Sequence, residues 1–397
     1  MARRNGGFVG QDGLDAPDPP TGITPTAGEL SVSVAFTAPS DAGTSAITGF
    51  VVQLSTDDTA YSAGSNTGTS SPIVVSSLTA GTAATAKVWA INAYGTSAPS
   101  SASASFTPLA LARALFSGGY LNSASVDVID YVTISTTGNA TDFGDLTAAR
   151  LRGGGSGASS TTRGVFGGGT GNDSSNVIDY VTIASTGDAT DFGDLTSARY
   201  DNSGLSNSTR GIWAGGTSSN VIDYITIGST GNATDFGDRS VTGGPLGAFA
   251  SSTRGVSGGA PSGSNVIDYI TIASTGNSTD FGNLTAGGNY GSGCSSGTRG
   301  VFFGGFRTSS VVTMDYVTIA STGNASDFGD LQSAPSQNSW GTSSSTRGLC
   351  AATFGTGTDI QYITIASTGD ALDFGNLTDD RHQLPHQAVS SGHGGLQ

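Results

Sequence analysis

Three histidines near the C-terminus, His382, His386 and His393, are the residues best suited to metal chemistry. Imidazole nitrogens are frequent zinc ligands, so a group of histidines is a candidate metal site. In a β-strand, however, residues four positions apart lie about 13 Å apart at roughly 3.3 Å per residue, which is too far for one ion. Only a bent loop would bring them together. We therefore expect neither a metal site nor a cofactor.

A second candidate is an arginine that recurs along the chain, in most copies within Thr-Arg-Gly, at Arg113, Arg163, Arg210, Arg254, Arg299 and Arg347. Such a set could form a basic ring. We instead predict that each arginine pairs with an aspartate of a neighbouring turn, such as Asp191 or Asp235. Surface ion pairs of this kind recur with a repeated scaffold and contribute little individually.

A repeated turn, Thr-Gly-Asn-Ala-Thr in its first copy, carries oxygen atoms that could bind calcium through Asn139, Asp142 and Asp145. Their spacing lacks the dense run of oxygen ligands found in calcium-binding loops. Asn and Asp favour turns because their side chains form hydrogen bonds with nearby backbone groups. We predict that these residues cap the turns.

No set of residues favours catalysis. The chain has neither a Gly-x-Ser-x-Gly elbow nor a phosphate-binding glycine loop between a strand and a helix. Glu29 is its only glutamate, and the aspartates Asp173, Asp201 and Asp359 have no spacing that favours a carboxylate pair. The sequence predicts a protein that is not an enzyme.

The composition indicates an all-β protein. Glycine contributes 62 of 397 residues, Lys87 is the only lysine, and short runs of Val, Ile, Thr, Tyr and Phe lie between Gly, Ser and Asn. A net charge of −15 disfavours nucleic-acid binding, and no apolar run approaches the roughly 20 residues of a membrane span. The first residues lack the apolar core of a secretory signal. We interpret Cys294 and Cys350 as small buried hydrophobic residues.

Most of the chain is a unit repeated six times. An acidic position recurs at residues 130, 179, 223, 268 and 315, with Gln361 in the last copy, so the copies are 44 to 49 residues apart. Each copy predicts four short strands, here called a to d in chain order. A repeat of this length is typical of a blade of a β-propeller.

The ends of the repeat region predict how such a ring would close. The first copy begins abruptly at strand b, Ala112–Gly119, whereas the sixth is followed by an extra strand-like tail, Gln387–Gly392. We predict that this tail supplies the missing strand a of the first blade. Ring closure removes the unpaired strand edges that invite aggregation.

The two faces of this ring should differ. Successive strands are antiparallel, so the a–b and c–d turns lie on one face, and these turns are nearly constant among the copies. The b–c loops and d–a connections lie on the other, here called the variable face, and they differ in length and content. Binding residues are often found on loops held by a rigid scaffold, so we expect a recognition site there.

The candidate ligand-binding residues lie on or near the variable face. Aromatic rings beside short hydroxyl side chains suit a carbohydrate or a cell-envelope ligand. The alternative for each is that it packs beneath a loop. The candidates are Tyr120, Tyr200, Tyr290, Phe306, Arg307 and Trp340.

Residues 19–108 resemble a fibronectin type III domain, a β-sandwich that usually serves as a spacer or adhesion module. The resemblance rests on Pro19–Pro20, Gly49–Phe50, Leu78 with Gly81–Thr82, Ala90–Ile91–Asn92 with Gly95, and Pro99–Ser100. Phe36 stands where that family usually has a core tryptophan, and Ala84 where it has a corner tyrosine. Residues 1–18 lack periodicity and are either a disordered tail or an arm that anchors the protein to a partner.

Residues 109–397 resemble kelch repeats, which implies a six-bladed β-propeller closed by the C-terminal strand. Paired glycines match that family at Gly168–Gly169, Gly215–Gly216, Gly258–Gly259 and Gly304–Gly305. Its tyrosine matches Tyr131, Tyr180, Tyr224, Tyr269, Tyr316 and Tyr362. Its tryptophan is replaced by Phe143, Phe192, Phe236, Phe281, Phe328 and Phe374.

The lysine-poor, Gly/Ser/Thr-rich repeats and the fibronectin-like segment are similar to virion proteins of marine tailed phages. That resemblance implies a tail-fibre, tail-tip or capsid-decoration protein, made in the host cytoplasm, that docks on other virion proteins through its N-terminal region. Its variable face would then attach to a host-surface glycan or envelope protein. A bacterial surface adhesin and a glycan-active enzyme are the alternatives.

Overall fold

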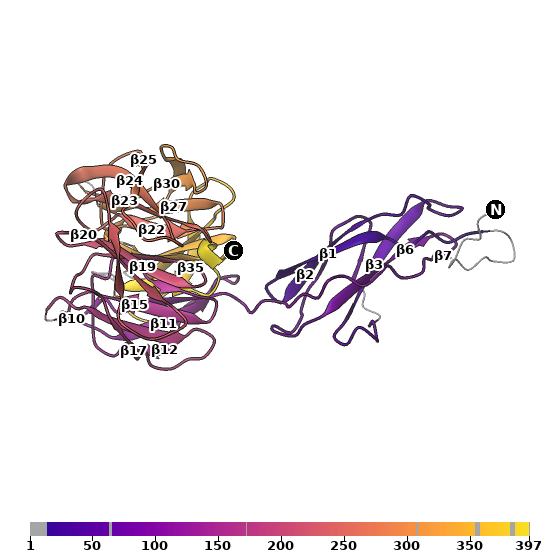
Figure 1. Ribbon diagram of the computed structural model, residues 1–397, viewed down its shortest axis with the longest axis horizontal. Coiled ribbons are helices and arrows are strands. Elements are labelled where there is room, and N and C mark those ends of the chain that lie inside the picture. Colours follow the sequence, from indigo (N-terminus) through magenta and orange to yellow (C-terminus); the bar gives the residue numbers. More distant parts are fainter. Residues whose placement is uncertain are drawn as a thin grey trace. The chain divides into compact units, whose positions relative to one another are not determined.

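The computed structural model describes residues 14–62, 66–171, 173–306, 309–353, 358–381 and 386–396, without the side chains of 335–338 and 352–353. These residues form strands and two short 3₁₀ turns, η1 (Pro261–Gly263) and η2 (Gly394–Leu396), so the described part of the chain is all-β, as the sequence predicts (Figure 1). It contains no helix long and apolar enough to span a membrane. The chain divides into two compact units, Met1–Leu111 and Ala112–Gln397.

Two sheets enclose the core of the first unit. One has the order β1 (Thr21–Gly28), β2 (Ser31–Thr37), β5 (Ile73–Val75), and the other β4 (Asn66–Gly68), β3 (Ile47–Ser55), β6 (Thr85–Asn92), β7 (Gly95–Thr96). Buried and partly exposed residues alternate along β2 and β6, because successive side chains of a strand point to opposite faces. Phe36 fills the core against Phe50, with ring centroids 4.7 Å apart.

Residues 14–18 belong to this unit. The Asp15 carbonyl accepts hydrogen bonds from the Asn92 side chain at 2.9 Å and from the Thr44 backbone at 3.2 Å. The Asp18 backbone donates to the Asp41 carbonyl. The described end of the segment interpreted as an arm is therefore fastened to the sheets, and residues 1–13 lie outside the described part.

The second unit consists of six sheets that follow one another along the chain, numbered here 1 to 6 and given from strand a to strand d. Sheet 1 is β36 (Gln387–Ser390), β8 (Arg113–Ser117), β11 (Val128–Thr133), β12 (Thr141–Asp145), and sheet 2 is β14 (Ala158–Ser159), β15 (Arg163–Gly167), β16 (Val177–Thr182), β17 (Thr190–Asp194). Sheet 3 is β18 (Ser203–Ser206), β19 (Arg210–Gly216), β20 (Ser219–Thr226), β21 (Thr234–Asp238), and sheet 4 is β22 (Gly247–Ala250), β23 (Arg254–Ala260), β24 (Ser264–Thr271), β25 (Thr279–Asn283).

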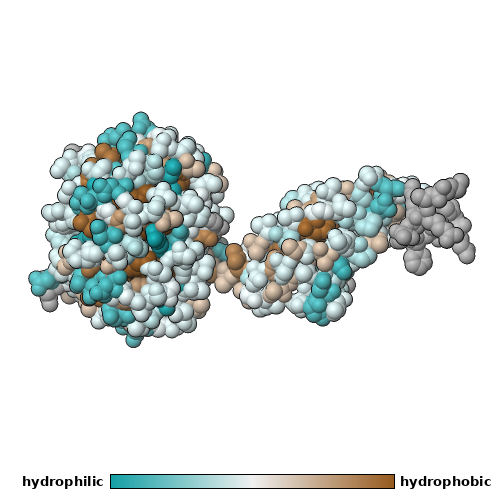
Figure 2. All heavy atoms as spheres, viewed as in Figure 1, coloured by the Kyte–Doolittle hydropathy of each residue, from teal (hydrophilic) through white to brown (hydrophobic). Residues whose placement is uncertain are grey.

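Sheet 5 is β26 (Ser292–Ser295), β27 (Arg299–Phe303), β30 (Thr313–Thr318), β31 (Ser326–Asp330), and sheet 6 is β32 (Pro335–Ser343), β33 (Arg347–Thr353), β34 (Asp359–Thr364), β35 (Leu372–Asn376). Two b–c loops form small hairpins of β9 (Tyr120–Leu121) with β10 (Ala124–Ser125), and of β28 (Gly305–Phe306) with β29 (Ser310–Val311). On the side of this unit seen in Figure 2, hydrophobic residues are scattered among hydrophilic ones.

The C-terminal strand completes sheet 1. β36 pairs antiparallel with β8, from Gln387 opposite Ser117 to Ser390 opposite Ala114, which confirms the prediction that the tail supplies the missing strand a. A further short strand, β13 (Gly155–Ser156), pairs parallel with β36 from the other side. Sheet 1 is thus held together by strands from both ends of the unit.

Hydrophobic clusters fill every junction between consecutive sheets, including the junction of sheet 6 with sheet 1. The last junction contains Phe116 of β8, Trp340 of β32 and Phe374 of β35. Cys294 and Cys350, both free thiols, are buried in the cluster between sheets 5 and 6, so the interpretation of the two cysteines as buried hydrophobic residues is confirmed.

Each c–d turn also bonds to strand d of the preceding sheet. The backbone N–H of Gly187 donates to the Phe143 carbonyl at 2.7 Å, and Gly138 donates to Phe374 across the junction of sheets 6 and 1. A methyl group at Gly144 would lie 2.5 Å from the Gly187 carbonyl oxygen, so only glycine permits this approach. The Asn and Asp side chains of these turns accept hydrogen bonds from backbone N–H groups, but from those of the neighbouring sheet rather than of their own turn. Asn139, for example, accepts a hydrogen bond from the Asn376 N–H.

A buried carboxylate joins most of these junctions. Asp130, Asp179, Asp223, Asp268 and Asp315 of the c strands are at most 3% exposed. Each accepts a hydrogen bond from a hydroxyl just beyond strand d of the preceding sheet, donated by Thr378, Thr147, Thr196, Ser240 and Thr285 in the same order. Four of them also pair with a buried arginine of that sheet, Arg381, Arg150, Arg199 and Arg239. Gln361, in the sixth copy, accepts from the Gln332 N–H instead.

The repeated surface arginines have other partners than predicted. Arg163 stacks over the Tyr180 ring of its own sheet, 4.4 Å from the centroid, and donates to the Ile227 carbonyl of the next sheet at 2.8 Å. The other five copies repeat this arrangement, with Arg347 of sheet 6 reaching Ile134 of sheet 1. The prediction of pairing with Asp191 or Asp235 is therefore wrong, because the guanidinium bridges backbone rather than carboxylates.

Deleting residues 387–397 should destabilise the whole second unit. The deletion removes β36 from between β8 and β13 and takes the buried Val389 side chain out of its core cluster. We expect the free energy of unfolding to fall by at least about 3 kcal/mol, measured by chemical denaturation. Deleting residues 1–13 is the control and should leave this transition unchanged. An unaltered unfolding transition after deletion of residues 387–397 would contradict the conclusion that β36 holds sheet 1 together.

Asp223→Ala should cost more than the equivalent change in sheet 6, Gln361→Ala. The Asp223 variant leaves the buried Arg199 without its partner, because Nη2 of Arg199 lies 2.8 Å from the Asp223 carboxylate. A buried charge that loses its partner costs about 3–5 kcal/mol. The second removes only an acceptor, at about 1–3 kcal/mol. Replacing Arg199 by Met together with Asp223→Ala should recover much of the loss. Equal costs for the two single variants would show that the ion pair is unimportant.

Candidate functional site

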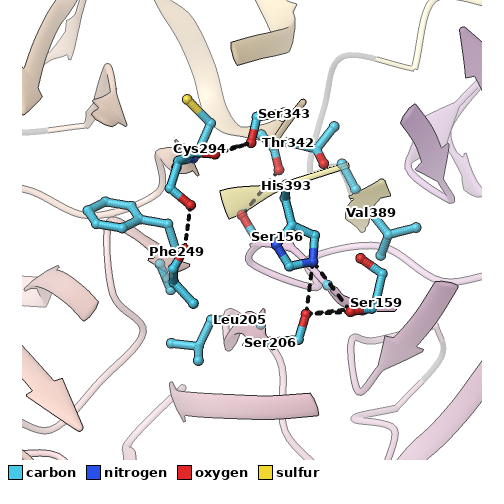
Figure 3. Close-up of a pocket in the computed structure, with 18 residues that line it drawn as sticks. Ser156, Ser159, Leu205, Ser206, Phe249, Cys294, Thr342, Ser343, Val389 and His393 are labelled. Atoms are coloured by element: carbon cyan, nitrogen blue, oxygen red, sulfur yellow. Dashed lines mark hydrogen bonds between the residues drawn. The ribbon is translucent and has the colours of Figure 1, made fainter. Parts of the chain in front are cut away.

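The axis of the second unit, where the inner strands of the six sheets meet, has no room for a ligand of ordinary size. A cavity of about 30 Å³ lies there, lined by residues of every sheet (Figure 3). A volume of this size holds about one water molecule. Serine hydroxyls around it are engaged with neighbouring strands: Ser206 donates to the Ser159 carbonyl at 2.9 Å and Ser159 to Ser390 at 2.7 Å.

Both ends of this axial space are covered. Towards the variable face, the segment 153–156 crosses between sheets, since Ser203 of sheet 3 donates to the Gly154 carbonyl at 2.7 Å and Ser156 donates to Gly341 of sheet 6. Towards the constant face, η2 contacts the inner strands β18, β22 and β26. Any ligand of the second unit must therefore bind outside the axial cavity.

The described histidines are structural. His386 Nε2 lies 3.0 Å from the Gly168 carbonyl and Nδ1 lies 3.1 Å from Ser117 Oγ. His393 Nε2 lies 3.2 Å from Ser206 Oγ (Figure 3), and Nδ1 accepts the Gly395 N–H. Burial lowers the pKa of His386 to about 3, assisted by the charge of Arg150, and lowers that of His393 to about 4. His382 lies outside the described residues, and within them no group of three His, Cys, Asp or Glu side chains is placed to hold a metal.

A cluster near the centre of the variable face is the best candidate for a binding site. Arg152, on the chain leaving sheet 1, makes a two-point ion pair with Asp201, on the chain leaving sheet 2, with Nε–Oδ1 at 3.2 Å and Nη2–Oδ2 at 2.6 Å. The guanidinium lies over the Tyr200 ring, 4.5 Å from its centroid. Burial lowers the pKa of Arg152, but Asp201 outweighs it and the pKa is raised, with smaller contributions from Tyr290 and Tyr200.

Tyr290 approaches this cluster from the chain between sheets 4 and 5. Its neighbour Gly291 touches the segment that carries Arg152: a methyl group at Gly155 would lie 2.9 Å from the Gly291 carbonyl oxygen. Tyr290 therefore lies on a segment that packs beside Gly155, three residues after Arg152. Three separate junctions of the unit thus contribute to one cluster, named here the central cluster: Arg152, Asp201, Tyr200 and Tyr290.

The backbone of the central cluster is strained at Arg152 and Tyr290, and Asp201 shares their left-handed conformation, which Asp tolerates. Arg152, Asp201 and Tyr290 have φ angles of 57°, 56° and 61°, in the left-handed region that side chains other than Gly, Asn and Asp rarely adopt. The Asp201 N–H, which donates to the Arg152 carbonyl at 2.7 Å, helps to hold the first two. Strain of this kind persists where surrounding structure enforces it, and such sites are often functional.

The central cluster contains only part of the predicted set. Tyr200 and Tyr290 are members, and both are partly exposed. Phe306 is hydrogen-bonded through its backbone to Asn289, the residue before Tyr290, so it lies beside the cluster. Tyr120 lies in β9, in the first b–c hairpin, also partly exposed, and no interaction joins it to the cluster. Arg307 lies outside the described residues.

The prediction that Trp340 is a ligand-binding residue of the variable face is wrong. It is fully buried in β32, with its Nε1–H donating to the Ser117 carbonyl at 3.1 Å and Arg381 lying over its ring. It fills the hydrophobic junction of sheets 6 and 1 and has no surface to offer a ligand.

Arg152 and Asp201 were missed as a pair, although the sequence carries a signal for them. Each lies two residues after a buried arginine, Arg150 or Arg199, so they occupy the same position in consecutive repeats. Opposite charges at equivalent positions of neighbouring repeats are candidates for an ion pair across the junction.

Comparisons with known proteins leave the family open. No family model and no curated protein matches the chain. Among solved structures, a crystal structure of domains A168-A170 from titin matches at 28% identity and a TM-score of 0.23, over 24% of this chain and 33% of that one. The chain thus spans about a third of that solved chain, and a score this low carries no argument about fold or function.

Acid should destabilise the second unit through His386 and His393. Their folded-state pKa values lie below the ordinary 6.5, so at mildly acidic pH the two histidines are protonated in the unfolded chain but not in the folded one. Stability should therefore be lost as pH falls below about 6.5, by up to about 1.4 kcal/mol per pH unit for each histidine. Urea unfolding between about pH 7 and pH 5 measures this slope. Replacing both by Gln should flatten it, and an unchanged slope would refute the assignment.

Proposed function

We propose that the second unit is a six-bladed, kelch-like β-propeller and the first a fibronectin type III-like sandwich. Six consecutive sheets support the first assignment: five have four strands, sheet 1 has a fifth in β13, and hydrophobic clusters join them at all six junctions. The repeated tyrosines and phenylalanines pack edge to face within each sheet, as Tyr180 and Phe192 do at 5.8 Å. Two facing sheets with Phe36 in the core support the second.

We propose that the protein is a non-enzymatic recognition component of a virus particle that attaches to the host surface. The observation that carries the recognition role is the central cluster: a strained, partly exposed group of aromatic and paired charged side chains on the face where the repeats differ. The strands, the a–b turns and the c–d turns of the propeller are constant scaffold. The axial cavity has space for about one water.

The virion assignment is supported by composition. The chain has 62 glycines and one lysine, with many Ser and Thr residues, and its repeats and fibronectin-like segment resemble virion proteins of tailed phages. In this proposal the N-terminal region contacts other virion proteins, and the variable face contacts a host-surface glycan or envelope protein. Nucleic acid and membrane insertion have no part in it, since the chain is strongly acidic.

Quantitative mass spectrometry of gradient-purified particles tests the virion assignment. We expect the protein to remain with the particles at a constant ratio to the major capsid protein through successive gradients. A protein that stays in the soluble fraction of the lysate would overturn it. The recognition role is tested separately: the purified chain should compete with particles for adsorption to host cells, whereas the first unit alone should not.

A further inference from the structure

From the chemistry of the central cluster, and resting on the recognition role proposed above, we infer that its ligand is an uncharged sugar of a host-surface glycan. The site would hold a sugar ring against the tyrosine side chains while the guanidinium of Arg152 donates hydrogen bonds to ring hydroxyls. Three observations support this: the neutrality of the ion pair, the acidity of its surroundings, and the lack of an apolar anchor.

The Arg152–Asp201 pair presents donors without net charge. Asp201 occupies Nε and one N–H of Nη2, which fixes the plane of the guanidinium. The side chain of Arg152 is 28% exposed, and no acceptor within the described residues engages its Nη1. A rigid, partly exposed guanidinium edge is suited to hydroxyl oxygens, and the Asp201 charge opposes a second carboxylate at the same place.

Among the described residues, the surroundings of the cluster also disfavour an anionic ligand. In the described loops of the variable face, Asp173 and Asp379 are exposed, whereas Arg150, Arg199, Arg239 and Arg381 are buried in the junctions. Arg152 is the one accessible guanidinium of those described loops, and it is already paired. With a chain charge of −15, uronic-acid or phosphate-bearing glycans meet repulsion on approach.

A protein ligand would need an apolar centre, and the described residues of this face offer none. Interfaces between proteins are usually anchored by large hydrophobic or aromatic residues in the middle of some 800 Å² per partner. Among the described residues of the second unit, the one exposed large hydrophobic residue is Leu372, on the outer strand β35. Two partly exposed tyrosines beside a planar charged pair form a much smaller platform, on the scale of one or two sugar rings.

Direct binding measurements test this inference. The full chain is titrated with neutral oligosaccharides built from glucose, galactose or mannose, and with uronic-acid and phosphate-bearing oligosaccharides of the same length. We expect at least one neutral series to bind, with an affinity that changes little between about 50 mM and 500 mM salt, because no net charge is neutralised. Binding confined to the anionic series, weakening with salt, would overturn the inference.

Four variants locate the site. Arg152→Gln and Tyr200→Ala should each weaken binding about tenfold or more, because they remove the donors or the ring. Tyr94→Ala, at an exposed tyrosine of the first unit, should bind as the parent does. Tyr290→Asn should lose affinity while its melting temperature stays equal or rises, because Asn accepts a φ of 61° more readily than Tyr. A marked fall in the melting temperature of this variant together with its loss of affinity would indicate that Tyr290 has a purely structural role.

Cell adsorption separates failure of this inference from failure of the proposed function. If the chain adsorbs to host cells but binds no oligosaccharide, and adsorption is abolished by treating the cells with protease, the ligand is an envelope protein. The recognition role then stands and the sugar assignment falls. If the chain does not adsorb to host cells at all, the recognition role itself is wrong.

Discussion

The junction between consecutive sheets is the interaction on which the second unit depends. At each junction, apolar side chains of two sheets interdigitate, a c–d turn bonds to the neighbouring strand d, and in most copies a buried aspartate collects a hydroxyl and a guanidinium from the sheet before it. Burying an unpaired carboxylate is expensive, so each sheet is stable only beside its neighbour. The repeats are alike because each must supply the hydrogen-bond donors and apolar side chains that the next sheet needs.

This dependence also explains why the two faces differ. The residues that form the junctions occupy the strands, the a–b turns, the c–d turns and the first residues beyond strand d. The repeated arginines stack on tyrosines and bond to the next sheet's backbone, and the buried arginines and hydroxyls beyond strand d bond to its aspartate. The b–c loops and the outer parts of the d–a connections contribute little to them. Those segments can therefore differ between copies without opening a junction, and they are where an asymmetric cluster such as Arg152 with Asp201 can arise.

Much of the fold could be predicted because its determinants are local and periodic. The repeat period predicts four strands per copy, and the truncated first copy with the strand-like tail predicts the pairing of β36 with β8. Contacts between repeats could not be predicted in this way. Arg150 and Asp179 are separated by 29 residues, and nothing in the pattern says which neighbour an arginine joins. The surface arginines were misassigned for the same reason.

The candidate site was partly predictable. Position in a variable segment identified Tyr200 and Tyr290, but the same criterion selected Trp340, because β32 begins earlier than the other inner strands and takes in residues that look like a loop. Arg152 and Asp201 escaped notice because their partnership depends on the path of the chain across the axis. A periodic pattern does not encode that path.

The path of the segment 153–156 has a consequence for how the chain matures. This segment, which follows Arg152 directly, pairs with β36, so it has no strand to bind until residues 387–390 have been synthesised. Early sheets can form while translation proceeds, but the strained loop carrying Arg152 becomes fixed only when the C-terminal strand arrives. A chain that stops before residue 387 would therefore present an unformed central cluster.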